Sequence, residues 1–342
     1  MEKTRSFTVR IVTVLFFVTI FCGLQGGNFF RAVSVPTKHA KAPKDETFLK
    51  AGREVPFSYG ALWDKYEIRN HSLELVLRAS KKIPSKSIHT VLRTEDGIER
   101  NAVLTLRKGA KGNIIMCHPA AYDKEFMIPY KDTVFAQYNC LRFDFRRHGE
   151  HSRKQYSTLG RKEVHEVFAA IEFLRQRKDT KDLPTFGFGV SLGASVLLRA
   201  EADRPFFKGL ILQAPFESLR KQIQRTFPAF EKPFLKYFMF REPVRTYAKL
   251  KYRLNLRNIK PVDAIAKISI PIFLIHAQDD PVVPFDAFRA LRKRGRSIVQ
   301  TWTPPIGRHT ELFMTFPDLY TRRCNSFLHR IMVNKQKIGK AT

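Results

Sequence analysis

The sequence predicts an α/β fold with a mostly parallel sheet of eight strands flanked by helices. Two observations lead to this prediction. From Ser87 onward, short apolar segments alternate with segments of helical periodicity, which is the pattern of an α/β layer structure. In the clearest helical segment, residues 161–177, apolar side chains recur three and four residues apart. Strands joined by crossover helices run parallel, with right-handed crossovers.

The elements follow one another in a regular order. The first two strands are expected to form a hairpin, because Asp96-Gly97 between them is typical turn chemistry. The predicted strands are residues 88–93, 101–106, 113–117, 140–145, 185–190, 209–213, 270–275 and 297–302. The predicted helices are residues 161–177, 195–202, 285–293 and 316–333. The α/β domain is therefore expected to span residues 87–333.

Residues 1–30 are predicted to lie outside this domain as a transmembrane or signal helix. Lys3, Arg5 and Arg10 precede residues 11–30, which carry no charge. Twenty helical residues rise about 30 Å, the thickness of the hydrocarbon core of a bilayer. The segment is therefore expected to anchor the protein in a membrane. A cleaved signal peptide has the same basic start and apolar run, so a secreted or periplasmic protein is the alternative. Lys and Arg on both flanks leave the orientation of the anchor open.

Three further segments differ from the regular pattern. Residues 31–86 are predicted to be a linker and accessory region, and residues 334–342 a basic tail. Residues 220–260 form an insertion between the sixth and seventh strands, with twelve Lys or Arg, two acidic and eight aromatic residues. This basic and aromatic composition suits a lid that faces anionic lipid or an amphipathic acyl substrate. It also suits a helical cap whose aromatic residues pack on the core.

Composition and charge exclude several classes of protein. With 44% apolar and 27% charged residues in a chain of 342, the protein is neither disordered throughout nor fibrous. No segment repeats at the period of a solenoid or propeller. The 61 Lys and Arg exceed the 31 Asp and Glu by 30, a balance that attracts anionic partners such as phospholipid headgroups. No zinc-finger spacing or RNP-like motif accompanies this charge, so nucleic acid is not an expected partner.

The cysteines and histidines predict no metal site and no cofactor. The four cysteines lie far apart and form neither a CxxC motif nor a disulfide framework. No histidine pairs with a cysteine or carboxylate at the spacing of metal ligands. The sequence gives no indication of the oligomeric state.

A reactive serine is predicted at the end of the fifth strand. Reactive groups in a parallel sheet gather at the carboxyl ends of the strands. Residues 189–193 read G-x-S-x-G, with Ser191 at the centre, and they lie between a predicted strand and a predicted helix. In that context a sharp turn lifts the serine hydroxyl above the sheet, and small residues are needed on either side of it.

A base and an acid are expected later in the chain, because a serine hydroxyl needs a positioned base and the base needs an acid. The seventh strand ends in a loop with two carboxylates, Asp279 and Asp280. The loop after the eighth strand carries His309. Serine, acid and histidine then come from successive strand ends and are expected to meet at one edge of the sheet.

These residues give residues 87–333 a resemblance to the α/β hydrolases, near the serine aminopeptidases, prolyl oligopeptidases and dienelactone hydrolases. The resemblance includes single-span, membrane-anchored esterase-like members. The matching pieces are the loop that starts at His118, the segment 144–152, which resembles D-x-R-x-x-G-x-S, the G-x-S-x-G turn, residues 213–216 and the acid loop 280–284.

The resemblance implies a role for each site residue. Ser191 is the nucleophile, His309 the base and Asp280 the acid, with Asp279 as the reserve, because the family writes H-G-x-x-D-x-x-V-P from the position of His276. The oxyanion hole is implied at the N–H groups of Leu192 and Ala120. The sequence departs from the family at Pro119, where the family has glycine. Proline has no N–H, which leaves open whether the geometry of the oxyanion hole is altered.

The sequence thus predicts a membrane-anchored serine hydrolase that cleaves carboxylic esters through an acyl-enzyme. The expected partners are a small-molecule acyl ester or peptide substrate and the membrane, reached through the N-terminal helix and the insertion. A serine peptidase with the same triad is one alternative, although the insertion has no acidic cluster to hold an N-terminal amine. A non-catalytic membrane-associated binding protein on the same fold is the other. The substrate and its acyl chain length are not predicted.

Overall fold

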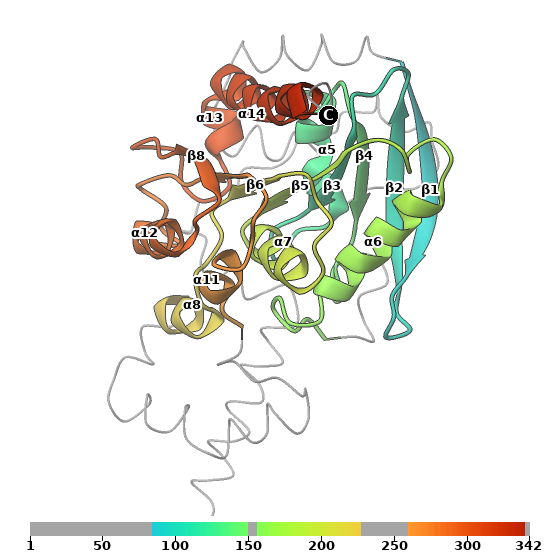
Figure 1. Cartoon of the computed structure of the whole chain (residues 1–342). Coiled ribbons are helices and arrows are strands. Elements are labelled where there is room, and N and C mark those ends of the chain that lie inside the picture. Colours follow the sequence, from blue (N-terminus) through green and yellow to red (C-terminus); the bar gives the residue numbers. More distant parts are fainter. Residues whose placement is uncertain (1–83, 150–155, 227–258, 339–342) are drawn as a thin grey trace, which may run out of the picture. The chain divides into compact units, whose positions relative to one another are not determined.

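Residues 84–149, 156–226 and 259–338 are described by the computed structural model (Figure 1). They belong to one compact unit, Ser72–Thr342. The predicted N-terminal helix, almost all of the predicted linker, most of the insertion and the last four residues lie outside the described residues. Among the helices that the structure describes, none is long and apolar enough to span a bilayer.

The predicted eight-stranded, mostly parallel sheet is confirmed. Its strand order is β1-β2-β4-β3-β5-β6-β7-β8. β2 pairs antiparallel with β1 and with β4, and every other neighbouring pair is parallel. The strands are β1 (Ser85–Arg93), β2 (Glu99–Arg107), β3 (Asn113–Cys117), β4 (Asn139–Phe143), β5 (Thr185–Val190), β6 (Leu210–Gln213), β7 (Ile272–Ile275) and β8 (Ile298–Trp302). The order places β5, β6, β7 and β8 side by side, so their carboxyl ends share one edge.

Helices cover both faces of the sheet (Figure 1). The helical segments are η2 (Lys124–Met127), α5 (Ile128–Asp132), α6 (Val164–Gln176), α7 (Leu192–Asp203), α8 (Leu219–Thr226), α11 (Pro261–Ile265), α12 (Phe285–Arg294), α13 (Leu312–Thr315) and α14 (Pro317–Ile338). α6 follows the predicted periodicity, since Val164, Val167, Phe168, Ile171 and Leu174 are all buried. This face packs on the sheet beside α7.

Alternate residues of the strands pack on opposite faces. Ile115 and Leu141 belong to the core that α6 and α7 form with one face of the sheet. Phe188 of β5 contacts the ring of Tyr130 in α5, and Phe273 of β7 contacts Phe327 of α14 on the other face. Burial on both faces explains why the central strands are continuous apolar runs rather than alternating ones.

Several element boundaries differ from the predicted ones, among them boundaries of β4, α7 and α14. β4 ends at Phe143, which leaves Asp144 in the following loop. α7 begins at Leu192, three residues before the predicted start, because Ser191 already takes the N-cap position. α14 continues to Ile338, because no glycine or proline interrupts it before Gly339. The predicted tail therefore begins inside this helix.

Candidate active site

Ser191 occupies a strained turn between β5 and α7. Its backbone has φ +54° and ψ −112°, outside the regions that side-chain-bearing residues ordinarily adopt. The backbone N–H of Ser191 donates to the carbonyl of Gln213 at the end of β6, at 2.8 Å. The residue is 9% exposed. A strained, over-determined backbone position of this kind is typical of functional sites.

The two glycines of the motif are required by close backbone contacts. A Cβ on Gly193 would lie 2.1 Å from the carbonyl oxygen of Cys117 in β3. A Cβ on Gly189 would lie 2.6 Å from the backbone nitrogen of Ala194. Neither position has room for a side chain, so α7 can start directly above the sheet only with glycine at both sites.

Asp280 lies in the loop between β7 and α12 and is fixed by the backbone. Its Oδ1 accepts hydrogen bonds from the N–H groups of Val282 and Val283, each at 2.8 Å. Its Oδ2 lies 2.7 Å from Nδ1 of His309 and 3.5 Å from Nε2 of His276. Burial alone would raise the pKa of the Asp280 carboxyl, but the two histidines and the backbone N–H of Val283 outweigh it and lower this pKa below its usual value. Asp280 is therefore held as a carboxylate.

His309 contacts both of the other predicted triad residues. Besides its bond to Asp280, its Nε2 lies 2.8 Å from Oγ of Ser191. A carboxylate only accepts hydrogen bonds, so Nδ1 carries the proton, and Nε2 is the nitrogen that can accept the hydroxyl proton of Ser191. The geometry matches that of a serine nucleophile with its general base and orienting acid.

Asp279, the reserve acid, lies elsewhere in the same site. Its Oδ1 accepts the backbone N–H of Arg308 at 2.8 Å, and in the described part of the chain no hydrogen bond joins the Asp279 side chain to the imidazole of His309. Asp279 thus holds the loop that carries His309, whereas Asp280 holds the ring itself.

The N–H groups of Leu192 and Ala120 are the predicted oxyanion donors. Leu192 directly follows Ser191 in the chain, and Ala120 lies in the loop after β3. Leu192 is the first residue of α7, where backbone N–H groups have no intrahelical acceptor. Ala120 follows β3, whose residue Cys117 touches Gly193. Neither N–H has an acceptor within the part of the chain that the structure describes. Their role as oxyanion donors stays a prediction.

His118 fixes the peptide that precedes Ala120. The N–H of Phe145 donates to Nε2 of His118 at 3.0 Å, so Nδ1 carries the proton and donates to the carbonyl of Pro119 at 2.7 Å. Burial lowers the pKa of His118 well below its usual value, which keeps the ring neutral. The peptide bond is planar and trans, so the Ala120 N–H points away from this carbonyl. Pro119 therefore takes part through its carbonyl, which proline retains.

Residues of the D-x-R segment support the loops around the site. The Asp144 carboxylate accepts the backbone N–H and the ammonium group of Lys124, just after the loop of Ala120. The Arg146 guanidinium bonds Glu166 of α6 and Asp96 of the β1–β2 turn. These buried and partly buried pairs hold the loops after β3 and β4 against the domain.

Gln213 and Tyr320 were not given a role by the sequence, although they contact the site. The Gln213 side chain donates to the carbonyl of His309 at 3.2 Å, and the hydroxyl of Tyr320 donates to Oε1 of Gln213 at 2.7 Å. Gln213 is the last residue of β6, and Ser191 directly follows the last residue of β5, so the position of Gln213 at a strand end is a signal in the sequence. Tyr320 has no local signal, because its partner lies in another element.

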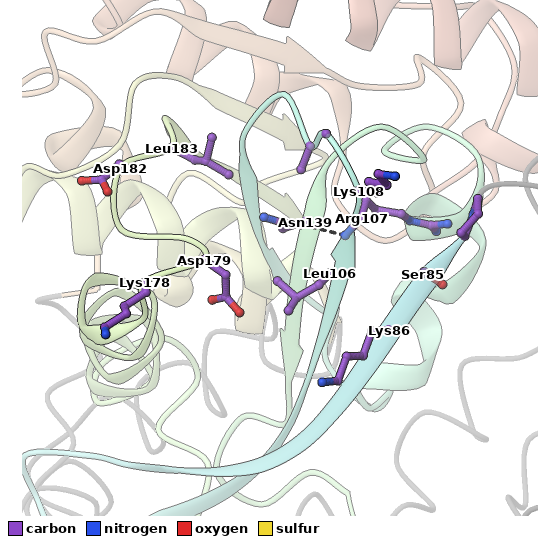
Figure 2. A pocket seen from close by; sticks show the side chains of 13 residues that line it. Ser85, Lys86, Leu106, Arg107, Lys108, Asn139, Lys178, Asp179, Asp182 and Leu183 are labelled. Atoms are coloured by element: carbon purple, nitrogen blue, oxygen red, sulfur yellow. Dashed lines mark hydrogen bonds between the residues drawn. The ribbon is translucent and has the colours of Figure 1, made fainter.

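A pocket of about 720 Å³ (Figure 2) lies at the end of the strands opposite to the predicted triad. Among its lining residues, Asn139 begins β4 and Arg107 ends the antiparallel strand β2, which places the pocket at the amino ends of the parallel strands. Lys86, Lys108 and Asp179 also line it. None of the predicted site residues contributes to this pocket. Within residues 84–149, 156–226 and 259–338, no group of His, Cys, Asp and Glu could hold a metal ion.

Residues 114–320 match the alpha/beta hydrolase family, and this match covers the sheet from β3 to β8 and all three predicted triad residues. The chain belongs to the α/β hydrolase family. The resemblance inferred from the motifs is thereby confirmed, together with the fold.

Curated relatives of this α/β hydrolase include the lysophosphatidylserine lipase ABHD12 of Macaca fascicularis. The two chains are 30% identical over 174 residues, which are 47% of this chain and 39% of the relative. The chain thus matches less than half the length of this relative. An uncharacterized protein of Bacillus subtilis, YqkD, is 25% identical over 224 residues, which cover 63% of this chain and 70% of that protein.

Among solved structures, the Pyrococcus furiosus esterase Pf2001 is similar to this α/β hydrolase with a TM-score of 0.56 and 21% identity. The match covers 74% of this chain and 94% of the esterase. At this level of identity the likeness supports the fold.

Proposed function

We propose that this protein is a serine hydrolase that cleaves carboxylic esters through an acyl-enzyme, with Ser191, His309 and Asp280 as its triad. One observation carries the proposal: Nε2 of His309 lies 2.8 Å from the Ser191 hydroxyl while Nδ1 lies 2.7 Å from the Asp280 carboxylate. The family membership, with a lipase and an esterase among the similar proteins, supports hydrolysis of an acyl ester.

In the proposed acylation step, Nε2 of His309 takes the Ser191 proton as Oγ attacks the carbonyl carbon of the ester. The Asp280 carboxylate stabilises the imidazolium that forms. The tetrahedral intermediate collapses when the imidazolium gives its proton to the alkoxide leaving group, which departs as an alcohol. The acyl group stays on Ser191 as an ester.

In the proposed deacylation step, water takes the place of the alcohol. His309 removes a proton from the water as its oxygen attacks the acyl carbon. Collapse of the second intermediate returns the proton to Oγ of Ser191 and releases the carboxylic acid. The N–H groups of Ala120 and Leu192 would bind the oxyanion in both steps, and one such donor contributes about 3 kcal/mol to the transition state.

We further propose an amphipathic acyl ester as substrate and a membrane as the site of action. The relative ABHD12 is named a lysophosphatidylserine lipase, which acts on an anionic amphiphile. The net charge of +30 and the basic and aromatic insertion of residues 220–260 suit such a substrate. Residues 1–30 would supply the membrane anchor, residues 31–86 the linker, and residues 87–333 the hydrolase domain.

Substrate preference tests this proposal against the peptidase alternative. We expect the purified protein to hydrolyse p-nitrophenyl esters of short and medium acyl chains, and to leave aminoacyl p-nitroanilides with a free amino group essentially uncleaved. The reason is that no acidic cluster is available in the insertion to hold an N-terminal amine. The measurement is kcat/KM for each substrate at equal enzyme concentration.

Two results would count against the esterase assignment. Faster turnover of the anilides than of the esters would favour a serine peptidase with the same triad. A folded protein that cleaves neither substrate class would favour a binding protein on the hydrolase fold.

A further inference from the structure

Gln213 is hydrogen-bonded to the backbone of both residues of the candidate proton-transfer pair, Ser191 and His309. Its carbonyl accepts the backbone N–H of Ser191 at 2.8 Å. Its side-chain Nε2 donates to the backbone carbonyl of His309 at 3.2 Å. Ser191 and His309 are 118 residues apart in the chain. Gln213 therefore links the two backbones: its carbonyl bonds the backbone of Ser191, and its side chain bonds the backbone of His309.

Tyr320 fixes the orientation of the Gln213 amide. Its hydroxyl donates to Oε1 at 2.7 Å, which leaves Nε2 facing the His309 carbonyl. Burial raises the pKa of Tyr320 well above its usual value, so the hydroxyl keeps its proton. Both side chains are fully buried. A flipped amide would place two acceptors against each other at His309 and would take away the acceptor of the Tyr320 hydroxyl proton, so the observed orientation is favoured.

The position of Gln213 in the sheet extends this connection to the acid. Gln213 ends β6 and is paired with Val190 of β5 on one side and Ile275 of β7 on the other. Val190 immediately precedes Ser191, and Ile275 ends the strand that leads to the loop of Asp280. Gln213 thus lies between the strands that lead to Ser191 and Asp280, and its side chain bonds the backbone of His309.

The loop of His309 needs such a support. Gly307 and Arg308 have φ values of +139° and +46°, so the backbone turns sharply just before the histidine. The side-chain bonds of the imidazole fix the ring, while Gln213 and Asp279 fix the backbone on either side of the Arg308–His309 peptide. Displacing a catalytic group by about 1 Å can lower the rate about 100-fold.

We propose that Gln213, oriented by Tyr320, is a positioning residue that sets the distance between the imidazole of His309 and the hydroxyl of Ser191. The inference rests on the function proposed above, because positioning has a kinetic effect only if His309 is the base. Gln213 itself does not touch the substrate; it acts through the two backbones that it joins.

The variant Gln213→Met tests the inference, because methionine nearly keeps the length of glutamine but has no N–H donor. We expect kcat for p-nitrophenyl ester hydrolysis to fall about 100-fold, with KM within about twofold of the wild-type value. The matched control is Asn113→Leu. Asn113 is a buried amide at the amino end of β3, where it bonds Thr180 and Thr185. Asn113→Leu removes a comparable set of buried hydrogen bonds, but it should leave kcat within about threefold of the wild-type value.

Tyr320→Phe and the double variant with Gln213→Met separate positioning from simple destabilisation. Tyr320→Phe removes only the hydroxyl that orients the amide, so a smaller fall in kcat is expected, about fivefold to tenfold. In the double variant the Tyr320→Phe change should add nothing to the loss caused by Gln213→Met, because the two residues act as one unit. If the fall in kcat of the double variant were instead the product of the two single falls, Gln213 and Tyr320 would act independently, which would contradict the proposed positioning unit.

A spectroscopic measurement decides the inference even if no ester is cleaved. In protein labelled with ¹⁵N-histidine, the Nδ1 proton that His309 shares with Asp280 should give a signal in the wild type and in Asn113→Leu. We expect this signal to broaden or shift in Gln213→Met. An unchanged signal, or a fall in kcat no larger than that of Asn113→Leu, would overturn the inference. An inactive wild type with the expected change in the signal would overturn the proposed function and keep the positioning role.

Discussion

Replacing Ser191 by alanine is expected to lower kcat for ester hydrolysis by about 10⁶-fold, the loss typical of a missing serine nucleophile. The change removes Oγ, which lies 2.8 Å from Nε2 of His309, and leaves no group that could form the acyl-enzyme. Folding should be little affected, because alanine is smaller and meets the same backbone strain at φ +54°. The measurement is steady-state hydrolysis of a p-nitrophenyl ester, with circular dichroism to check the fold.

Ser326→Ala is the control for this variant. Ser326 is an exposed serine on α14, and it should keep wild-type kcat. If Ser191→Ala retained more than about one hundredth of the wild-type rate while folded, Ser191 would not be the nucleophile.

Asp280→Asn is expected to lower kcat by about 10⁴-fold, and the hydrogen bonds of the acid explain why. Oδ1 of Asp280 accepts two backbone N–H groups, from Val282 and Val283, so the carbonyl oxygen of an asparagine would stay there. Its amide NH₂ would then face Nδ1 of His309 from the position of Oδ2. The imidazole would move its proton to Nε2 and could no longer accept the proton of Ser191. The charge that stabilises the imidazolium would also be lost.

Asp279→Asn provides the matched control in the neighbouring position. Asp279 accepts only the backbone N–H of Arg308 in the described structure, and an asparagine oxygen can accept the same bond. We expect kcat to stay within about tenfold of wild type. A larger loss in Asp279→Asn than in Asp280→Asn would reverse the assignment of the acid.

Asp280→Asn should also change the pH dependence of folding stability, which is measured by denaturant unfolding at several acid pH values. The folded-state pKa of Asp280 lies below its usual value, so its stabilising contribution is complete above the usual pKa of an aspartate. This contribution is lost as the pH falls through the lowered folded-state value. Asp280→Asn removes the contribution, which makes the stability of this variant less dependent on pH in the acid range.

Much of the site could be predicted from the sequence, because parallel strands bring their carboxyl ends to one edge. Ser191, Asp280 and His309 each follow a strand, and the structure brings their side chains within hydrogen-bond distance. The glycines beside Ser191 mark a turn whose close contacts exclude any side chain. Local patterns of this kind predict which strand end carries the serine, which the acid and which the histidine.

The remaining features depend on contacts between distant elements. Asp279 and Asp280 are adjacent in one loop, and only the direction of each side chain in three dimensions assigns one to the imidazole and the other to the Arg308 backbone. Gln213 and Tyr320 lie 107 residues apart, and neither shows a local signal for its partner. The position of β3 between β4 and β5 likewise follows from packing of the whole sheet.

Labelling with a fluorophosphonate followed by peptide mapping tests the proposed acyl-enzyme chemistry most directly. A fluorophosphonate reacts with an activated serine hydroxyl and stays covalently attached to it. We expect one adduct per folded wild-type chain, on the peptide that carries Ser191, and none on Ser191→Ala. A folded wild-type protein that forms no adduct, or forms it on another residue, would contradict the account.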